Sequence, residues 1–292
     1  MRHHRRLSAL GLCAADAAVL ALAGWAAVIC GARRWASGSA LLHAALSDHQ
    51  LAVSPPVFSA KELVGLPAPV MRYFETVLTQ GQSMVASARL RQTGRINMRD
   101  AGNHWRHFSA VQRVVARRPG FDRDARIAIA PGVSVRVHDA YVAGEGQLRA
   151  AVLGLFSVAH TVPSAALSEA ELMRFLAEAV WLPTALLPSQ GVVWAAVDAQ
   201  SATATLQDSG HCVRLLFHFQ TDGLVDSVRA EARTRLVDGV ATAAPWHGRF
   251  RHAAARGGMM VPLAAEVAWL LPDGEHCYWQ GQITRADYTF QT

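Results

Sequence analysis

The histidines and cysteines could bind a metal ion, so their spacing is considered first. The sequence contains 13 histidines and 4 cysteines, and His104 with His107 is the best-spaced histidine pair. On a strand, residues three apart point to opposite faces and cannot share one ion. The neighbours in His211-Cys212 and in His276-Cys277 also point apart, which leaves a site shared between two strands as the alternative. Without a CxxC pair or a zinc-type spacing, we predict no metal and no cofactor.

Carboxylates close to basic and aromatic side chains could perform acid–base catalysis if they converged in a dry cleft. Asp122 and Asp124 share one face of a predicted strand, and Asp139 lies beside His138 and close to Tyr141. Three arginines are equally near and favour solvated ion pairs instead, namely Arg123, Arg126 and Arg136. The sequence lacks a nucleophile elbow, an HExxH motif, a P-loop and a GxGxxG turn before a helix. We therefore predict no catalytic residues.

Large aromatic side chains are the most informative candidates for ligand binding. Several tryptophans fall in or beside predicted strands, where such residues usually form core. The alternative is that some of them line a cavity for a lipid or acyl chain, because these ligands are held in apolar pockets with few polar groups. The candidate lining residues are Trp105, Phe175, Trp181, Trp194, Trp246, Trp269 and Trp279.

The basic charge is concentrated at the N-terminus. The net charge is +6, and residues 1–36 contain five arginines and one acid, Asp16, so this segment accounts for +4. The rest of the chain is nearly neutral, and we predict no nucleic-acid partner.

A membrane segment is the simplest interpretation of this N-terminus. Residues 7–32 form a mainly apolar run, and about 20 such residues span a bilayer. Arg33, Arg34 and Trp35 follow as a flank typical of a membrane boundary. We predict one span over residues 7–32 in the inner (cytoplasmic) membrane, with the C-terminal part extracytoplasmic. A signal peptide cleaved within residues 36–40 is the alternative.

The periodicity of apolar residues changes along the chain. The predicted organisation is a membrane anchor (1–36), a membrane-proximal stalk (37–58) with a helix at 41–51, and one globular domain (59–292). Ser59 with Glu62, and Ser168 with Glu171, have the spacing of capping boxes at helix starts. A short helix follows Pro67, and a second helix is expected at 168–183. From Met84 the period is otherwise that of strands.

The predicted strands are joined by short turns and do not alternate with helices. They cover residues 85–98, 104–116, 122–130, 133–143, 146–153, 192–198, 202–207, 211–220, 224–236, 245–253, 259–270 and 277–290. This pattern indicates an α+β, mainly β fold, with one large curved antiparallel sheet, half-barrel-like, and a few covering helices. Cys212 and Cys277 fall in these strands as buried apolar residues, with a disulfide between them as the alternative.

Four segments resemble an uncharacterised bacterial family, a domain of unknown function in proteins with hydrophobic N-termini. They are residues 65–74, 105–112, 186–194 and 267–274, and the resemblance covers roughly residues 60–290. It implies no activity. The order of elements is also loosely similar to that of the periplasmic lipoprotein-sorting, LolA-like proteins, which implies a curved sheet covered by helices that accepts acyl chains.

These observations together predict a membrane-anchored protein that binds an apolar ligand, namely a lipid, an acyl chain or a lipidated partner, without catalysis. Two alternatives stay open. One is an enzyme of unknown reaction that uses Asp122, His138 and Asp139, and the other is a structural envelope protein.

Overall fold

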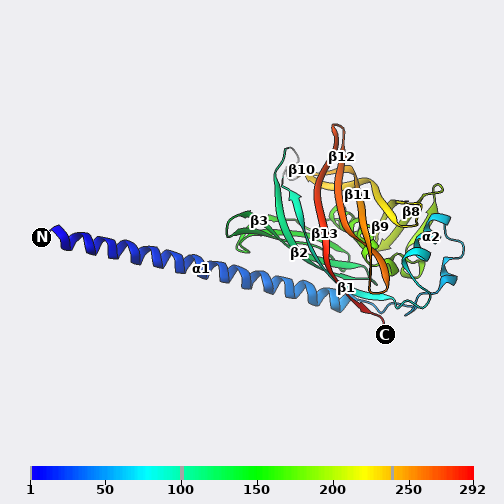
Figure 1. Cartoon of the computed structure of the whole chain (residues 1–292), viewed down its shortest axis with the longest axis horizontal. Helices are drawn as coiled ribbons and strands as arrows, with labels where there is room; N and C mark the ends of the chain where they lie inside the picture. Colours follow the sequence, from blue (N-terminus) through cyan, green and yellow to red (C-terminus); the bar gives the residue numbers. More distant parts are fainter. Residues whose placement is uncertain (1, 99–101, 238–239) are drawn as a thin grey trace.

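The computed structural model describes residues 2–98, 102–237 and 240–292, with side chains from residue 22 onward except residue 236. Within these residues, 13 strands form one antiparallel sheet that curls around a set of helices (Figure 1). The mainly β fold class predicted from the sequence, a half-barrel-like curled sheet with a few helices, is confirmed.

The first half of the sheet is a run of hairpins in which each strand pairs with the one before it. Its strands are β1 (Val85–Asn97), β2 (Trp105–Val115), β3 (Gly120–Ala130), β4 (Val133–Val142), β5 (Glu145–Val152) and β6 (Phe156–His160). β6 was not predicted from the sequence. It is a short edge strand with mostly exposed side chains, so its sequence lacks the alternation that a half-buried strand shows.

The second half of the sheet is also a run of hairpins, which begins at the opposite edge of the sheet from β6. Its strands are β7 (Val193–Ala196), β8 (Ser201–Asp208), β9 (His211–Phe219), β10 (Val225–Val237), β11 (Val240–Arg256), β12 (Met259–Leu271) and β13 (Gly274–Phe290). β13 pairs with β1 from Val85↔Phe290 to Ile96↔Trp279 and so joins the two halves. Register shifts interrupt several pairs, including β10 with β11 and β12 with β13. Such bulges add local bend and twist to a sheet, which fits the curled shape.

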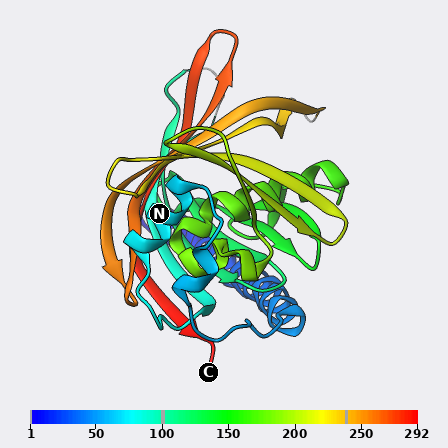
Figure 2. The same cartoon turned by 90° about the vertical axis from the view of Figure 1, so that its right-hand side faces the viewer.

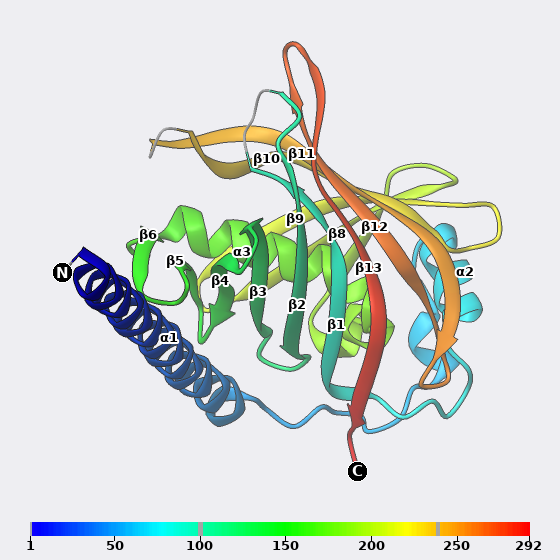
Figure 3. The ribbon, with the colours of Figure 1, turned by 60° about the vertical axis from the view of Figure 1, so that its left-hand side comes forward.

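Short helices fill the concave face of the sheet (Figures 2 and 3). They are η1 (Ala60–Leu63), α2 (Ala68–Val77), α3 (Ala165–Glu178), η2 (Ala179–Trp181), η3 (Pro183–Leu186) and η4 (Pro188–Gln190). The apolar stripe of α2, with Val70, Phe74 and Val77, is buried against the strands as its spacing predicts. These helices and the inward-facing strand residues form one apolar core.

The start of α3 differs from the prediction. Ser164, not Ser168, is the N-cap residue, and its hydroxyl accepts from the Leu167 backbone N–H at 3.3 Å. Ser168 lies inside the helix and accepts from the Gly146 backbone N–H at 2.9 Å, while Glu171 is buried among arginines. The predicted capping box at Ser168 is therefore wrong, because both residues face the interior and bind partners on other elements.

A helix of 48 residues, α1 (Arg2–His49), precedes the sheet and passes the predicted anchor–stalk border at residue 36 without a break. Its C-terminal part lies on the outer face of β2, β3 and β4 (Figure 3), where Trp35 and Leu46 are buried. Residues 7–21 of the predicted span lie outside the part with described side chains. In the described part, no helix has the length and apolarity needed to cross a membrane.

The cysteines differ from the expectation of buried apolar residues. Cys212 is exposed, Cys277 is half-buried, and both are free thiols. The structure therefore has no disulfide between Cys212 and Cys277, which was the alternative expectation.

Candidate ligand-binding hollow

A cavity of about 710 Å³ lies between α3 and the concave faces of the surrounding strands. We call it the hollow. Its volume falls within the range of about 300–1,000 Å³ that is typical of small-molecule sites. Its largest apolar lining residues are Trp181, Trp246, Phe250, Trp269, Tyr278 and Trp279.

The aromatic lining is held in place by contacts among its members. The Trp246 indole N–H donates to the Tyr278 hydroxyl at 3.0 Å, and Trp269 stacks on the Tyr278 ring with centroids 5.7 Å apart. Trp181 meets Phe250 edge-on at 6.5 Å. Aromatic pairs with these geometries stabilise one another beyond simple burial, so this wall is preorganised.

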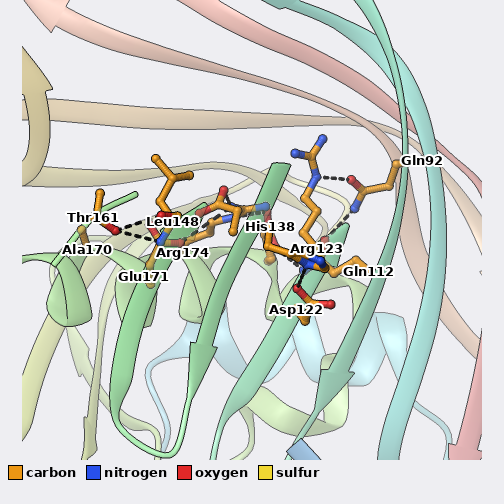
Figure 4. Close-up of polar contacts among 12 residues, drawn as sticks. Gln92, Gln112, Asp122, Arg123, His138, Leu148, Thr161, Ala170, Glu171 and Arg174 are labelled. Carbon is orange, nitrogen blue, oxygen red and sulfur yellow. Dashed lines mark hydrogen bonds and ion pairs between the residues drawn. The ribbon is translucent and has the colours of Figure 1, made fainter. Parts of the chain in front are cut away.

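A chain of polar side chains connects β1, β2 and β3 with α3 beside the hollow, and part of it is drawn in Figure 4. Arg123 donates through Nε to Gln92 Oε1 at 2.9 Å, and Gln92 donates to Gln112 Oε1 at 2.8 Å. Gln112 then donates to Glu178 Oε2 at 2.6 Å, and Arg174 donates to Glu178 Oε1 at 2.8 Å. The sheet and α3 are thus connected through buried hydrogen bonds, which are costly to break when a partner is lost.

Arg174 lies between three carboxyl groups on α3 and β4. It forms ion pairs with Asp139, with Glu178 and, at 3.7 Å, with Glu171. Burial alone would lower the pKa of Arg174, but these neighbouring carboxylates raise it well above its ordinary value. Arg174 is therefore a permanent cation inside the hollow.

At Glu171, burial and a neighbouring charge favour the uncharged form of the side chain. Burial first, and then the charge of Asp139, raise the pKa of Glu171 to about 8, although Arg233 and Arg174 act against this rise. Arg233 contributes an ion pair to Glu171 Oε1 at 3.4 Å. At neutral pH the Glu171 carboxyl is therefore mainly protonated and uncharged.

Arg123 is the least compensated cation in the hollow. Its side chain is 6% exposed, and its guanidinium lies over the rings of Phe108 and Trp279, at 4.7 and 5.7 Å from their centroids. Burial, followed by the charge of Arg174, lowers the pKa of Arg123 to about 10, so it still carries its charge at neutral pH. Among the described residues, its terminal nitrogen Nη2 has no hydrogen-bond partner.

The structure brings four of the seven aromatic candidates together around the hollow, namely Trp181, Trp246, Trp269 and Trp279. Phe175 and Trp194 are buried in the core instead, where Trp194 packs against Phe217 at 5.1 Å. Trp105 lies at the start of β2, half-buried beneath the guanidinium of Arg95.

The candidate acid–base residues do not converge. Asp139 faces the hollow, whereas Asp122 and His138 lie on the outer face of the sheet beneath α1. The expectation that Asp122 and Arg123 form solvated ion pairs is wrong, because both side chains are buried, on opposite faces of β3. The burial of Asp122 and Arg123 was not predicted, because nothing in the sequence indicates that helices cover both faces of the sheet. One signal was present: Arg123 alternates with Phe121, Ala125 and Ile127, which places it on the same face of β3 as these apolar residues.

Ser39, His138 and Asp122 have the order of hydrogen bonds found in a Ser-His-Asp triad. Ser39 Oγ lies 3.0 Å from His138 Nε2, and His138 Nδ1 lies 2.8 Å from Asp122 Oδ1. However, the Trp35 ring stacks on His138 at 4.5 Å, and Ser39 is buried within a helix. None of the three triad-like residues lines the hollow. This cluster therefore fastens α1 to the sheet rather than exposing a nucleophile.

The described residues contain no group of three or more His, Cys, Asp or Glu side chains placed to hold a metal ion. What they do contain is a preorganised aromatic wall together with a buried, mostly paired set of charges, in which Arg123 and Arg233 lie over tryptophan rings. The fold and this site together define a curled antiparallel-sheet protein with an internal amphipathic cavity.

Comparison with known proteins places this chain in a family. Residues 64–288 match the "Family of unknown function (DUF6920)", and the chain belongs to that family. No curated protein matches the chain. Among solved structures it is similar to a LolA superfamily protein from Nitrosomonas europaea, with 10% sequence identity, a TM-score of 0.39, and coverage of 77% of this chain and 94% of that chain.

Proposed function

We propose that this protein binds an apolar or amphiphilic ligand, of the class of a lipid, an acyl chain or a lipidated partner, in the hollow and without catalysis. The observation that supports this function is a cavity of about 710 Å³ with six large aromatic side chains in its wall. Burial of apolar surface there drives binding at roughly 25 cal/mol per Å². The candidate acid–base residues lie on opposite faces of the sheet, which favours binding over catalysis.

Replacing Trp269 by leucine is expected to weaken ligand binding about tenfold. The indole forms part of the aromatic wall, and leucine covers less apolar surface. The measurement is calorimetric titration of the full chain, held in zwitterionic nanodiscs, with decanoate and with decanol, using protein-free nanodiscs as the blank. Trp105→Leu is the matched control, because Trp105 does not line the hollow. Failure of both amphiphiles to bind the unmodified chain would overturn the proposed function.

The ligand site is proposed to lie outside the cytoplasm, on a domain held at the inner membrane by residues 7–32. The support is the apolar run between two arginine clusters. In the described part of this run, the large apolar side chains of Leu22, Trp25 and Val28 are exposed on α1. A membrane would cover such side chains.

Labelling of Cys212 tests this placement, because its thiol is exposed. A membrane-impermeant maleimide is expected to modify Cys212 in intact spheroplasts, as identified by mass spectrometry of the labelled peptide, and total labelling should decrease in Cys212→Ser. Labelling that requires permeabilised membranes would place the domain in the cytoplasm and contradict the proposal.

A further inference from the structure

Buried polar atoms in the lining of the hollow favour one kind of ligand group. Among the described residues, three lining atoms have no hydrogen-bond partner: Arg123 Nη2, Trp181 Nε1 and Glu171 Oε2, the last of which lies 3.7 Å from Arg174 Nη1. The first two can only donate hydrogen bonds. Glu171 can also donate, because its carboxyl is mainly protonated at neutral pH. An acceptor-rich group on the ligand would therefore satisfy what the protein leaves unsatisfied.

The charges of the hollow also favour a ligand group that accepts hydrogen bonds, and one that is negatively charged. Arg123, Arg174 and Arg233 are three buried cations, and with Glu171 protonated only Asp139 and Glu178 oppose them. The remaining charged members of the lining, Arg235 and Glu266, are half-buried and opposite in sign. The buried part of the lining thus carries about one uncompensated positive charge. A buried charge without a counterion is unfavourable.

Among the described residues, Arg123 is the one of these three cations with a buried terminal nitrogen, Nη2, that has no hydrogen-bond partner. Arg174 is paired with the Asp139 carboxylate, and Arg233 donates to the Ala170 carbonyl at 3.1 Å and to Glu171 Oε1 at 3.4 Å. Arg123 instead donates from Nε to the neutral amide of Gln92, and within the described part of the chain its Nη2 has no hydrogen-bond partner. Its free guanidinium end matches a carboxylate, which can accept two parallel hydrogen bonds. The adjoining Phe108 and Trp279 rings offer apolar contact to the atoms next to such a headgroup.

We propose that the ligand of the hollow is an amphiphile with a carboxylate headgroup, which binds Arg123 while its apolar chain lies against the aromatic wall. This inference rests on the proposed function and specifies the ligand class. A carboxylate matches one excess charge, whereas a phosphate monoester carries about −1.5 to −2 at neutral pH.

Comparison of headgroups on one chain length tests the assignment. The full chain in zwitterionic nanodiscs is titrated calorimetrically with decanoate, decyl phosphate and decanol. We expect decanoate to bind at least about tenfold more tightly than decanol, as for a hydrogen-bonded charge pair, and no less tightly than decyl phosphate. Equal affinities for decanoate and decanol would overturn the headgroup assignment while leaving the proposed function intact. Tighter binding of decyl phosphate would assign a phosphate instead, and no binding of any of the three would overturn both.

Variants of Arg123 locate the contact. In Arg123→Gln the preference for decanoate over decanol is expected to disappear, and binding of decanol that is still measurable shows that the hollow is intact. Arg123→Lys should keep part of the preference for decanoate, because lysine keeps the positive charge but lacks the planar guanidinium that can donate two parallel hydrogen bonds. Arg89→Gln is the matched control, since Arg89 is exposed on β1 and does not line the hollow. A preference that persists in Arg123→Gln would contradict the role of Arg123.

Discussion

Asp122→Ala is expected to lower the free energy of unfolding by about 3 kcal/mol or more, because it leaves the buried His138 and the half-buried His43 without their acceptor. Asp122 is fully buried between the sheet and α1, and it lies 2.8 Å from His138 Nδ1 and 3.1 Å from His43 Nε2. Chemical denaturation of the full chain measures the loss. Asp226→Ala is the control, since Asp226 is exposed on β10 and should change stability by no more than about 0.5 kcal/mol.

The pH dependence of this loss has a defined sign. Burial alone would raise the pKa of Asp122, but hydrogen bonds from His138 and His43 hold it below its ordinary value. A carboxyl group with a lowered folded-state pKa stabilises the fold above the unfolded-state pKa, about 3.9, and loses this effect as the pH falls through the folded-state pKa. The difference between Asp122→Ala and the unmodified chain should therefore shrink as the pH falls below about 4.

Hydrogen exchange separates release of α1 from general destabilisation. If the Asp122 cluster fastens α1, the amides of residues 31–49 should exchange faster in Asp122→Ala, while those of β12 and β13 should stay protected. Uniform acceleration across the sheet would contradict the fastening role. Two side chains of α1 make the fastening contacts: Ser39 contacts His138 on β4, and His43 contacts Asp122 on β3.

The sheet could be predicted from the sequence because its signals are local. Alternating residues and Gly, Pro and Asp turns define a strand within a few positions. Of the 13 strands in the described residues, 12 were expected near their observed places. β6 escaped because an exposed edge strand leaves no such alternation. The start of α3 was misplaced because Ser168 and Glu171 imitate a capping box while they bind partners on distant elements.

The polar side of the hollow could not be derived in the same way. Its hydrogen bonds connect residues far apart in sequence, such as Gln112 with Glu178 and Arg233 with Glu171. Charged residues on strands usually face solvent, and only the three-dimensional arrangement shows that α3 covers Arg123 while α1 covers Asp122. The aromatic wall was easier to anticipate, because tryptophan has few alternatives to core or ligand contact.

Glu171→Gln is expected to remove a pronounced pH dependence of stability. Because the folded-state pKa of Glu171 is raised to about 8, the folded chain keeps a proton that the unfolded chain releases above about pH 4.3. The free energy of unfolding of the unmodified chain should therefore decrease as the pH rises from about 5.5 to 8. The contribution of Glu171 to this slope is at most about 1.4 kcal/mol per pH unit, the value for release of one proton.

A glutamine at position 171 keeps the shape of the protonated carboxyl but cannot ionise, so the slope of Glu171→Gln should be smaller and the variant should be the more stable protein at pH 8. Denaturation curves at pH 5.5, 6.5, 7.5 and 8.5 give the comparison. Glu75→Gln is the control, because Glu75 is exposed on α2 and should leave the slope unchanged. Equal slopes for Glu171→Gln and the unmodified chain would show that Glu171 is ionised in the folded state. The excess positive charge of the hollow would then vanish with it, since three carboxylates would balance three buried arginines.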